Sequence, residues 1–236
     1  MTLSKLISGT KEMNIELTDK EQKEFEVFKA LLMEWNEKIN LTAIKDPDEI
    51  DIKHFLDSLT LLKTNYFEGE LKVLDVGTGG GFPGIPLKIL RPELNISLLD
   101  SLKKRLNYLD IVIETLGLEN IETLHGRAED FAKTDRRESY DRVVSRAVAN
   151  LSTLSEYCLP YVKVGGYFIA MKGPEVGDEM NTAKKAISLL GGKIIEKIDV
   201  EIPHSDLHHN LVVIKKINKT PKRYPRQAGQ PKKNPL

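Results

Sequence analysis

The chain has 236 residues, of which 40% are hydrophobic and 30% are charged, as expected for a globular protein with one sizeable domain and a small addition. Its formal net charge is zero, so whole-molecule electrostatics do not indicate a nucleic-acid-binding protein, although no acidic residue follows Asp206. One cysteine can build neither a disulfide framework nor a cysteine-based metal site. No apolar run is long enough for a transmembrane helix or a secretory signal, so we expect a cytoplasmic protein without a metal.

Residues 1–65 are predicted to form a helical extension. Thr18 and Glu21 fit a capping box, and apolar residues then recur at helical spacing from Phe25 to Ile39. Asp46-Pro47 predicts the start of a second helix, because proline is favoured at the first helical position.

From Leu71 onward, short β-rich segments alternate with amphipathic helices, which predicts a parallel sheet covered by helices on both faces. Strands are expected at Lys72–Val76, Asn95–Leu99, Ile121–His125, Arg142–Ser145, Gly166–Lys172, Lys193–Glu201 and Asn210–Ile217. Helices are expected at Lys103–Leu116, Leu151–Leu159 and Asp178–Leu190. The linker between the last two strands is too short for a crossover helix, so they should form an antiparallel hairpin. We therefore predict an α/β fold, Rossmann-like, with a seven-stranded, mostly parallel sheet over residues 66–218.

Residues 219–236 form a basic tail that contains four prolines, and we expect it to be extended because proline cannot continue a helix or a central strand. Its cations would neutralise RNA phosphates, and Tyr224 would stack on a base. The alternative is a solvated, disordered tail. The candidate RNA-contacting residues are Lys172, at the end of a strand, and Arg223, Tyr224 and Arg226.

The first predicted strand ends in a turn with four glycines in five positions, at Gly77 and Gly79–Gly81, which brings bare backbone close to a ligand. Two interpretations compete. Gly79–Gly84 matches the spacing of a dinucleotide fingerprint, and an NAD-dependent oxidoreductase is one alternative function. The other frame, Asp75-x-Gly77-x-Gly79-x-Gly81, places a carboxylate at the strand end, where it would attract an ammonium group.

We favour S-adenosylmethionine (SAM), which carries an ammonium and no phosphate. In the dinucleotide frame the glycines start too late after the strand, and Phe82-Pro83 would crowd the site of a pyrophosphate. Asp100, which ends the second strand, is expected to accept the ribose hydroxyls, with a helix N-cap as the alternative. The loop at His125–Asp130 would flank the adenine or simply begin a helix.

At these residues the sequence resembles the small-subunit rRNA methyltransferase G family, also called GidB, over nearly its whole length. The motifs that carry the resemblance are VLDVGTGGGFPGIPL (Val73–Leu87), HGRAED (His125–Asp130), YDRVVSRAV (Tyr140–Val148), AMKG (Ala170–Gly173), the tail RYPRQAGQPKKNPL, and WNEKINLTAI and KHFLDSL near the N-terminus. The resemblance implies SAM-dependent methylation of guanine N7 in the 530 loop (G527 in the usual rRNA numbering) of 16S rRNA, free or in the small subunit. By position it implies SAM contacts at Gly77, Phe82, Ala128, Glu129 and Arg146, and Gly79 belongs to the same turn.

The residues agree with N7 as the acceptor, because N7 has a free lone pair and loses no proton. Methylation of a pyrimidine C5 needs a cysteine nucleophile, whereas Cys158 is expected to be a small buried hydrophobe. Arg146 and Glu129 are the candidate catalytic residues. His54 is a further candidate, and for Asp57 and Ser58 we favour the helix surface over the site. A monomer is expected, and a SAM-binding ribosome-associated module without transfer activity is the remaining alternative.

Overall fold

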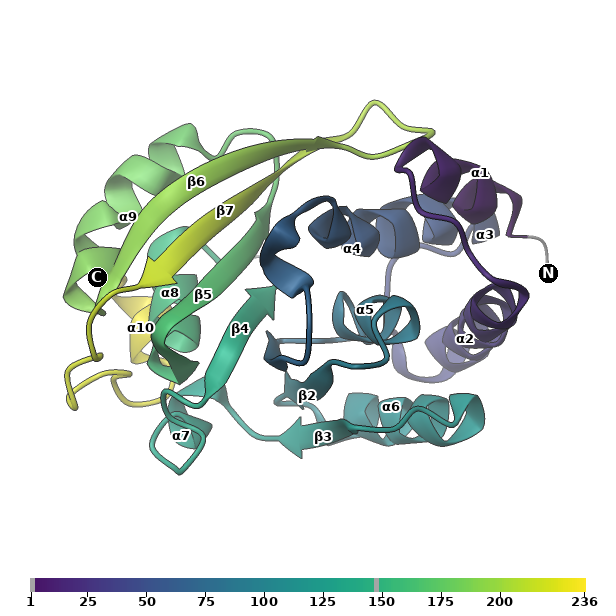
Figure 1. Cartoon of the computed structure of the whole chain (residues 1–236). Coiled ribbons are helices and arrows are strands. Elements are labelled where there is room, and N and C mark those ends of the chain that lie inside the picture. The colour runs from purple at the N-terminus through teal and green to yellow at the C-terminus, as the bar shows by residue number, and fades with distance from the viewer. Residues whose placement is uncertain (1–2, 147–148) are drawn as a thin grey trace.

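The computed structural model describes residues 3–146 and 149–236, in which seven strands form one sheet in the order β3-β2-β1-β4-β5-β7-β6 (Figure 1). The first five strands of the chain pair in parallel, whereas β7 pairs antiparallel with both β5 and β6. The predicted sheet and its closing hairpin are confirmed. The strands are β1 (Lys72–Val76), β2 (Asn95–Asp100), β3 (Ile121–His125), β4 (Tyr140–Ser145), β5 (Val162–Lys172), β6 (Gly192–Glu201) and β7 (His208–Lys216).

Helices cover both faces of the sheet, as predicted. The helices that follow β1 and β2 pack on one face, and those that follow β4 and β5 pack on the other (Figure 1). Alternation along the strands explains this, because Val73 faces one hydrophobic cluster and Leu74 faces the other. The helices that follow the first five strands, in chain order, are α5 (Gly84–Leu90), α6 (Lys103–Leu116), α7 (Ala128–Phe131), α8 (Leu151–Cys158) and α9 (Gly177–Leu189).

The N-terminal extension packs on the face that carries α5 and α6 (Figure 1). It contains α1 (Ser4–Glu12), α2 (Asp19–Ile39), α3 (Pro47–Ile50), a π-helical turn (Asp51–Leu56), α4 (Asp57–Leu59) and two short 3-10 turns, Thr60–Lys63 and Asn65–Phe67. The capping box of α2 is present, with the Thr18 hydroxyl accepting from the Glu21 amide. The predicted domain boundaries at 65/66 and 218/219 remain predictions, since the extension shares a hydrophobic cluster with the sheet.

The tail is packed against the protein, so the expectation of an extended tail is wrong. Its side chains contribute to the second hydrophobic cluster, and a short helix, α10 (Gln230–Lys233), contacts α8. Pro231 lies in the first turn of α10, where its missing amide hydrogen costs no helical hydrogen bond. Among the described residues, no helix is long and apolar enough to cross a membrane.

Candidate functional site

The glycine-rich turn joins the ends of β1 and β2 at the carboxyl edge of the sheet. The amides of Gly77 and Thr78 donate to the carbonyl of Leu99, at 2.8 and 3.1 Å. Gly77, Gly79 and Gly81 have φ angles of 75°, 59° and 97°, in the left-handed region that favours glycine. A Cβ on Gly79 would meet nothing closer than 3.9 Å, so the open side of the turn can receive a ligand.

Asp75 lies beneath this turn and does not line the cavity above it. Its Oδ2 accepts hydrogen bonds from the Thr78 hydroxyl at 2.7 Å and from the Gly84 amide at 2.9 Å. The side chain is fully buried, and burial raises the pKa of Asp75 to about 6. Asp75 is therefore not placed to attract an ammonium group, contrary to expectation. Its role is structural, because the carboxylate ties the turn to the start of α5.

A cavity of about 350 Å³ opens above the turn, at the carboxyl ends of β1, β2 and β3. Its wall includes Gly77, Asp100, Ala128 and Glu129, four of the predicted cofactor contacts. A larger cavity, of about 590 Å³, lies at the amino ends of the same strands, beside Arg136, and has no glycine-rich turn. Parallel sheets bind ligands outside the carboxyl ends of their strands, so we assign the smaller cavity to the cofactor.

Asp100 is placed for a nucleoside. Its carboxylate accepts from the Gly79 amide at 3.0 Å and from the Leu102 amide at 2.8 Å, which leaves lone pairs for ribose hydroxyls. The N-cap alternative is wrong, because α6 is capped by Leu102 without a side-chain hydrogen bond. The cavity residues thus fit SAM, and Asp100 remains the candidate for its ribose hydroxyls, with the loop that contains Ala128 in the same cavity wall.

Glu129 is 5% exposed, and its Oε1 accepts a hydrogen bond of 2.9 Å from the backbone amide of Gly229 in the tail. Both Gly229 and Lys232 line the same cavity. Sequence patterns gave no sign that the tail reaches the cofactor site, because this contact joins residues 100 positions apart.

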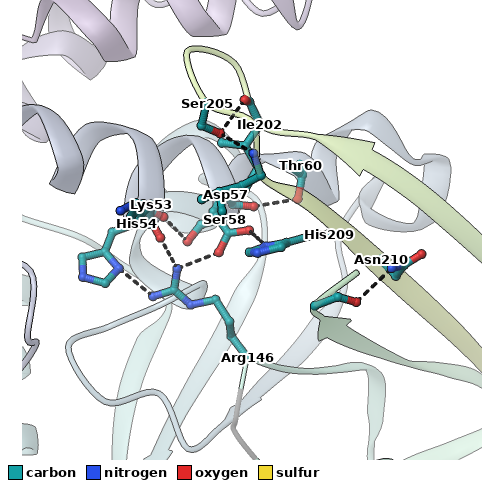
Figure 2. Close-up of polar contacts among 12 residues, drawn as sticks. Lys53, His54, Asp57, Ser58, Thr60, Arg146, Ile202, Ser205, His209 and Asn210 are labelled. Carbon is teal, nitrogen blue, oxygen red and sulfur yellow. Dashed lines mark hydrogen bonds and ion pairs between the residues drawn. The ribbon is translucent and has the colours of Figure 1, made fainter. Parts of the chain in front are cut away.

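Arg146, at the end of β4, is held from three directions (Figure 2). Its Nη1 donates to the Lys53 carbonyl at 2.9 Å and to Asp57 Oδ2 at 2.8 Å, and its Nη2 donates to His54 Nδ1 at 3.0 Å. A guanidinium is a donor at every nitrogen, so His54 Nδ1 must accept. His54 Nε2 therefore carries the hydrogen and donates to the Thr42 hydroxyl at 2.7 Å. Burial and the nearby Arg146 cation lower the pKa of His54 to about 3.

Asp57 joins Arg146 to the last strand. Its Oδ1 accepts a hydrogen bond of 2.8 Å from His209 Nδ1, and the Asp57 side chain is 2% exposed (Figure 2). Although burial disfavours its charge, hydrogen bonds from His209 and Arg146 hold the pKa of Asp57 below its ordinary value. The expectation that Asp57 and Ser58 lie on a helix surface is wrong, since Ser58 is also buried.

His209 was missed from the sequence, although one signal was available. An antiparallel final strand begins at the carboxyl edge of the sheet, so its first residues lie beside the end of β5. Ala147 and Val148, which end the motif that begins at Tyr140, lie outside the described residues.

The side chain of Phe82 packs inward, away from the cavity. It is 4% exposed, stacks on the His54 ring with 4.6 Å between ring centroids, and lies 5.0 Å from the Arg146 guanidinium carbon. A cofactor contact of its side chain therefore does not fit, and its backbone remains the candidate. We define the Arg146 cluster as His54, Asp57, Arg146 and His209. The Phe82 ring connects the glycine-rich turn to this cluster.

Three of the four predicted RNA contacts, Tyr224, Arg226 and Lys172, are engaged within the protein. Tyr224 is 7% exposed, so stacking of its ring on a base does not fit this structure. Arg226 forms an ion pair with Glu156. Lys172 donates to Glu179 and to the Ala149 carbonyl, at 2.7 and 2.9 Å, and Arg223 is exposed with its guanidinium over the Tyr224 ring.

The strand order, the glycine-rich turn and the acidic end of β2 together define a class I SAM-dependent methyltransferase. Solved structures are similar to this chain in fold. One is a TYW2 of M. jannaschii in complex with AdoMet, with a TM-score of 0.54, 16% identity, and coverage of 68% of this chain and 77% of that one. Another is a SAM-dependent methyltransferase of Aquifex aeolicus, with a TM-score of 0.52, 21% identity, and coverage of 74% and 96%.

The family described as rRNA small subunit methyltransferase G matches residues 21–205. Curated relatives with the name ribosomal RNA small subunit methyltransferase G include those of Clostridium novyi and Clostridium tetani. The first is 57% identical over 95% of this chain and 93% of its own length, and the second is 55% identical over 98% and 97%. The chain therefore belongs to the rRNA small subunit methyltransferase G family. This confirms the resemblance and the SAM cofactor, and it excludes the NAD-dependent alternative.

Replacement of Gly84 by alanine should destabilise the fold through the Asp75 contact. A Cβ at Gly84 would meet the Leu98 side chain and, at 2.9 Å, Asp75 Oδ2. Overpacking of this kind costs about 1–3 kcal/mol of unfolding free energy, measured by urea denaturation. The matched control is Gly177→Ala, because Gly177 also begins a helix and a Cβ there meets nothing within 4 Å. Equal unfolding free energies for the two variants would contradict the packing argument.

His54 should remain neutral well below its ordinary pKa of 6.5. Because the folded pKa is lowered, the unfolded chain binds a proton first, and the free energy of unfolding falls by about 1.4 kcal/mol for each pH unit below 6.5. The loss continues until the pH reaches the folded value of about 3. NMR of the imidazole should show no titration between pH 7 and pH 5, and His54→Gln should lack this part of the pH dependence of unfolding. A midpoint near pH 6.5 in the folded protein would show the assignment to be wrong.

Proposed function

We propose that this protein transfers the methyl group of SAM to N7 of a guanine in the 530 loop of 16S rRNA. The observation that carries the choice of N7 is the state of the groups around Arg146. Both oxygens of Asp57 and both ring nitrogens of His54 are engaged in hydrogen bonds. Neither ring nitrogen of His54 is free to take a proton from an acceptor. Asp57 is a weak base because, despite its burial, hydrogen bonds from His209 and Arg146 hold its pKa below its ordinary value. N7 is an acceptor that has no proton to lose.

SAM supplies a methyl group bound to a sulfonium, which makes that methyl electrophilic. The lone pair of N7 forms the new N–C bond as the S–C bond breaks, and the positive charge moves from sulfur to the base. Catalysis then consists mainly of alignment, which in favourable cases contributes about 7–11 kcal/mol. The protein must therefore hold the base and the cofactor rigidly and exclude water.

Arg146 is suited to orient the ligands. It uses three N–H groups within the described part of the protein, which leaves two of its five donors for the guanine O6 or the SAM carboxylate. Its charge is balanced by Asp57, so it does not add an unpaired cation beside a base that becomes positive. We assign Glu129 to the cofactor cavity, because it lines that cavity and its Oε1 is held by the Gly229 amide. The basic side chains of Lys172 and Arg223 remain candidates for contact with rRNA phosphates.

The activity is tested with radiolabelled SAM and small ribosomal subunits, or free rRNA, from a strain that lacks the enzyme. We expect label in 7-methylguanosine within the 530 loop. SAM binding without transfer would favour the alternative of a ribosome-associated module that keeps SAM as a ligand. Comparison of free rRNA with assembled subunits identifies the substrate, and an rRNA substrate would place the reaction in the bacterial cytoplasm.

Asp57→Asn should lower kcat/KM for rRNA by about 100-fold, because a small displacement of an orienting group has effects of that order. The variant keeps the size of the side chain but removes the charge that Arg146 and His209 share. Steady-state transfer of labelled methyl measures the effect, and circular dichroism checks folding. Ser58→Ala is the control, because among the described residues the hydroxyl of this buried neighbour donates only to the backbone carbonyl of His54. Similar losses in both variants would contradict a specific role for Asp57.

A further inference from the structure

The tail closes one side of the cofactor cavity. Glycine-rich turns and acidic strand ends supply the floor of such a cavity, and here Gly229 and Lys232 supply part of its wall. Figure 1 shows the tail running back past α7 and α8 to reach this position. The tail therefore lies where it would contact the cofactor.

The contact at the cavity is between Gly229 and Glu129. Glu129 is 5% exposed, and a buried carboxylate oxygen that loses its donor destabilises the folded state. The Gly229 amide satisfies Oε1 at 2.9 Å. Gly229 has a φ angle of 84°, so this amide is presented by a backbone conformation that favours glycine.

The tail is anchored at a second point, away from the cavity. Arg226 donates to the fully buried side chain of Glu156 through Nε at 2.9 Å and Nη2 at 2.6 Å, and the Arg226 amide donates to the same carboxylate at 2.8 Å. Arg226 Nη2 also donates to the Asn234 carbonyl at 2.8 Å, which ties the two ends of the segment together. Neither Arg226 nor Glu156 lines the cavity.

Further contacts fix the segment on both sides of that anchor. Arg137 donates to the carbonyls of Thr220 and Tyr224, at 2.7 and 2.9 Å. The Thr153 hydroxyl of α8 donates to the Pro231 carbonyl at 3.0 Å. Buried ion pairs with several hydrogen bonds are strongly destabilised when one partner is removed, so Glu156 requires Arg226 in place.

We propose that Arg226 and Glu156 are positioning residues for SAM binding: they hold the tail so that Gly229 fixes Glu129 and the cavity wall is complete. The inference rests on the SAM-dependent function proposed above. The proposal differs from a role of the tail in RNA binding alone. An arginine that contacts RNA affects the affinity for rRNA and its salt dependence, whereas a positioning arginine affects the affinity for SAM even when no RNA is present.

The test compares Arg226→Ala with Arg223→Ala by isothermal titration of SAM into the protein alone. Both variants remove one positive charge from the tail, and Arg223 forms no ion pair among the described residues. We expect the Kd for SAM to rise about tenfold or more in Arg226→Ala, and to stay within about twofold of wild type in Arg223→Ala. Arg226→Lys, which keeps the charge without the paired donors, should be intermediate. SAM should protect the wild-type tail from trypsin, and this protection should be lost in Arg226→Ala.

The outcomes are distinguishable. A wild-type protein that does not bind SAM would overturn the proposed function itself. An unchanged Kd for SAM in Arg226→Ala, with a raised KM for rRNA, would overturn the inference alone. If Arg226→Ala does not fold, a chain that ends at Gln227 keeps the ion pair but lacks Gly229 and Lys232, and it must also bind SAM more weakly.

Discussion

The arrangement of residues at the carboxyl edge of the sheet depends on the buried carboxylate of Asp57. A charge removed from water is tolerated when its partners are close, and Arg146 and His209 are both 2.8 Å from Asp57. These three residues belong to the N-terminal extension, the end of β4 and the beginning of β7. Loss of Arg146 would leave the buried Asp57 charge without its cation, and loss of His209 would leave Asp57 Oδ1 without its donor. The three segments therefore hold one another in place. The extension is thus a component of the site.

The cofactor cavity and the Arg146 cluster are built from different parts of the chain. At the cofactor cavity, the turn above Asp75 presents glycine backbone, and the Gly229 amide of the tail holds the Glu129 carboxylate. The Arg146 cluster instead joins side chains from elements far apart in sequence (Figure 2). The ring of Phe82 lies between the turn and this cluster, stacked on His54, and couples their positions.

Local patterns predicted the regular elements well. β1, β3 and α6 have the predicted bounds, because apolar periodicity, strand-ending polar residues and Gly117 define them within a few residues of sequence. β5 begins at Val162 instead of Gly166, since Gly165 and Gly166 interrupt the β-rich pattern, and the pairing with β4 shifts register there and then continues. The prediction that Asp57 lies on a helix surface is wrong because it assumes α-helical spacing. The preceding π-helical turn, Asp51–Leu56, shifts which residues face inward.

The tail could not be predicted for a different reason. Its prolines and lysines are typical of a solvated segment, and composition does not reveal a partner 70 residues away such as Glu156 for Arg226. Glu156 itself looks like an ordinary helix residue in sequence, although its side chain is fully buried. Gly77 and Asp100 were found because each follows directly from a strand end, where the topology fixes the position.

The order of residues in the cavity wall has a consequence for biosynthesis. Translation produces the turn, Asp100, Glu129 and the wall residue Tyr157 before it produces Gly229. A nascent chain can therefore complete its sheet from β1 to β7 while the cofactor site still lacks one side. If the tail completes the cavity wall as proposed, tight binding of the methyl donor waits until the final segment has emerged and docked.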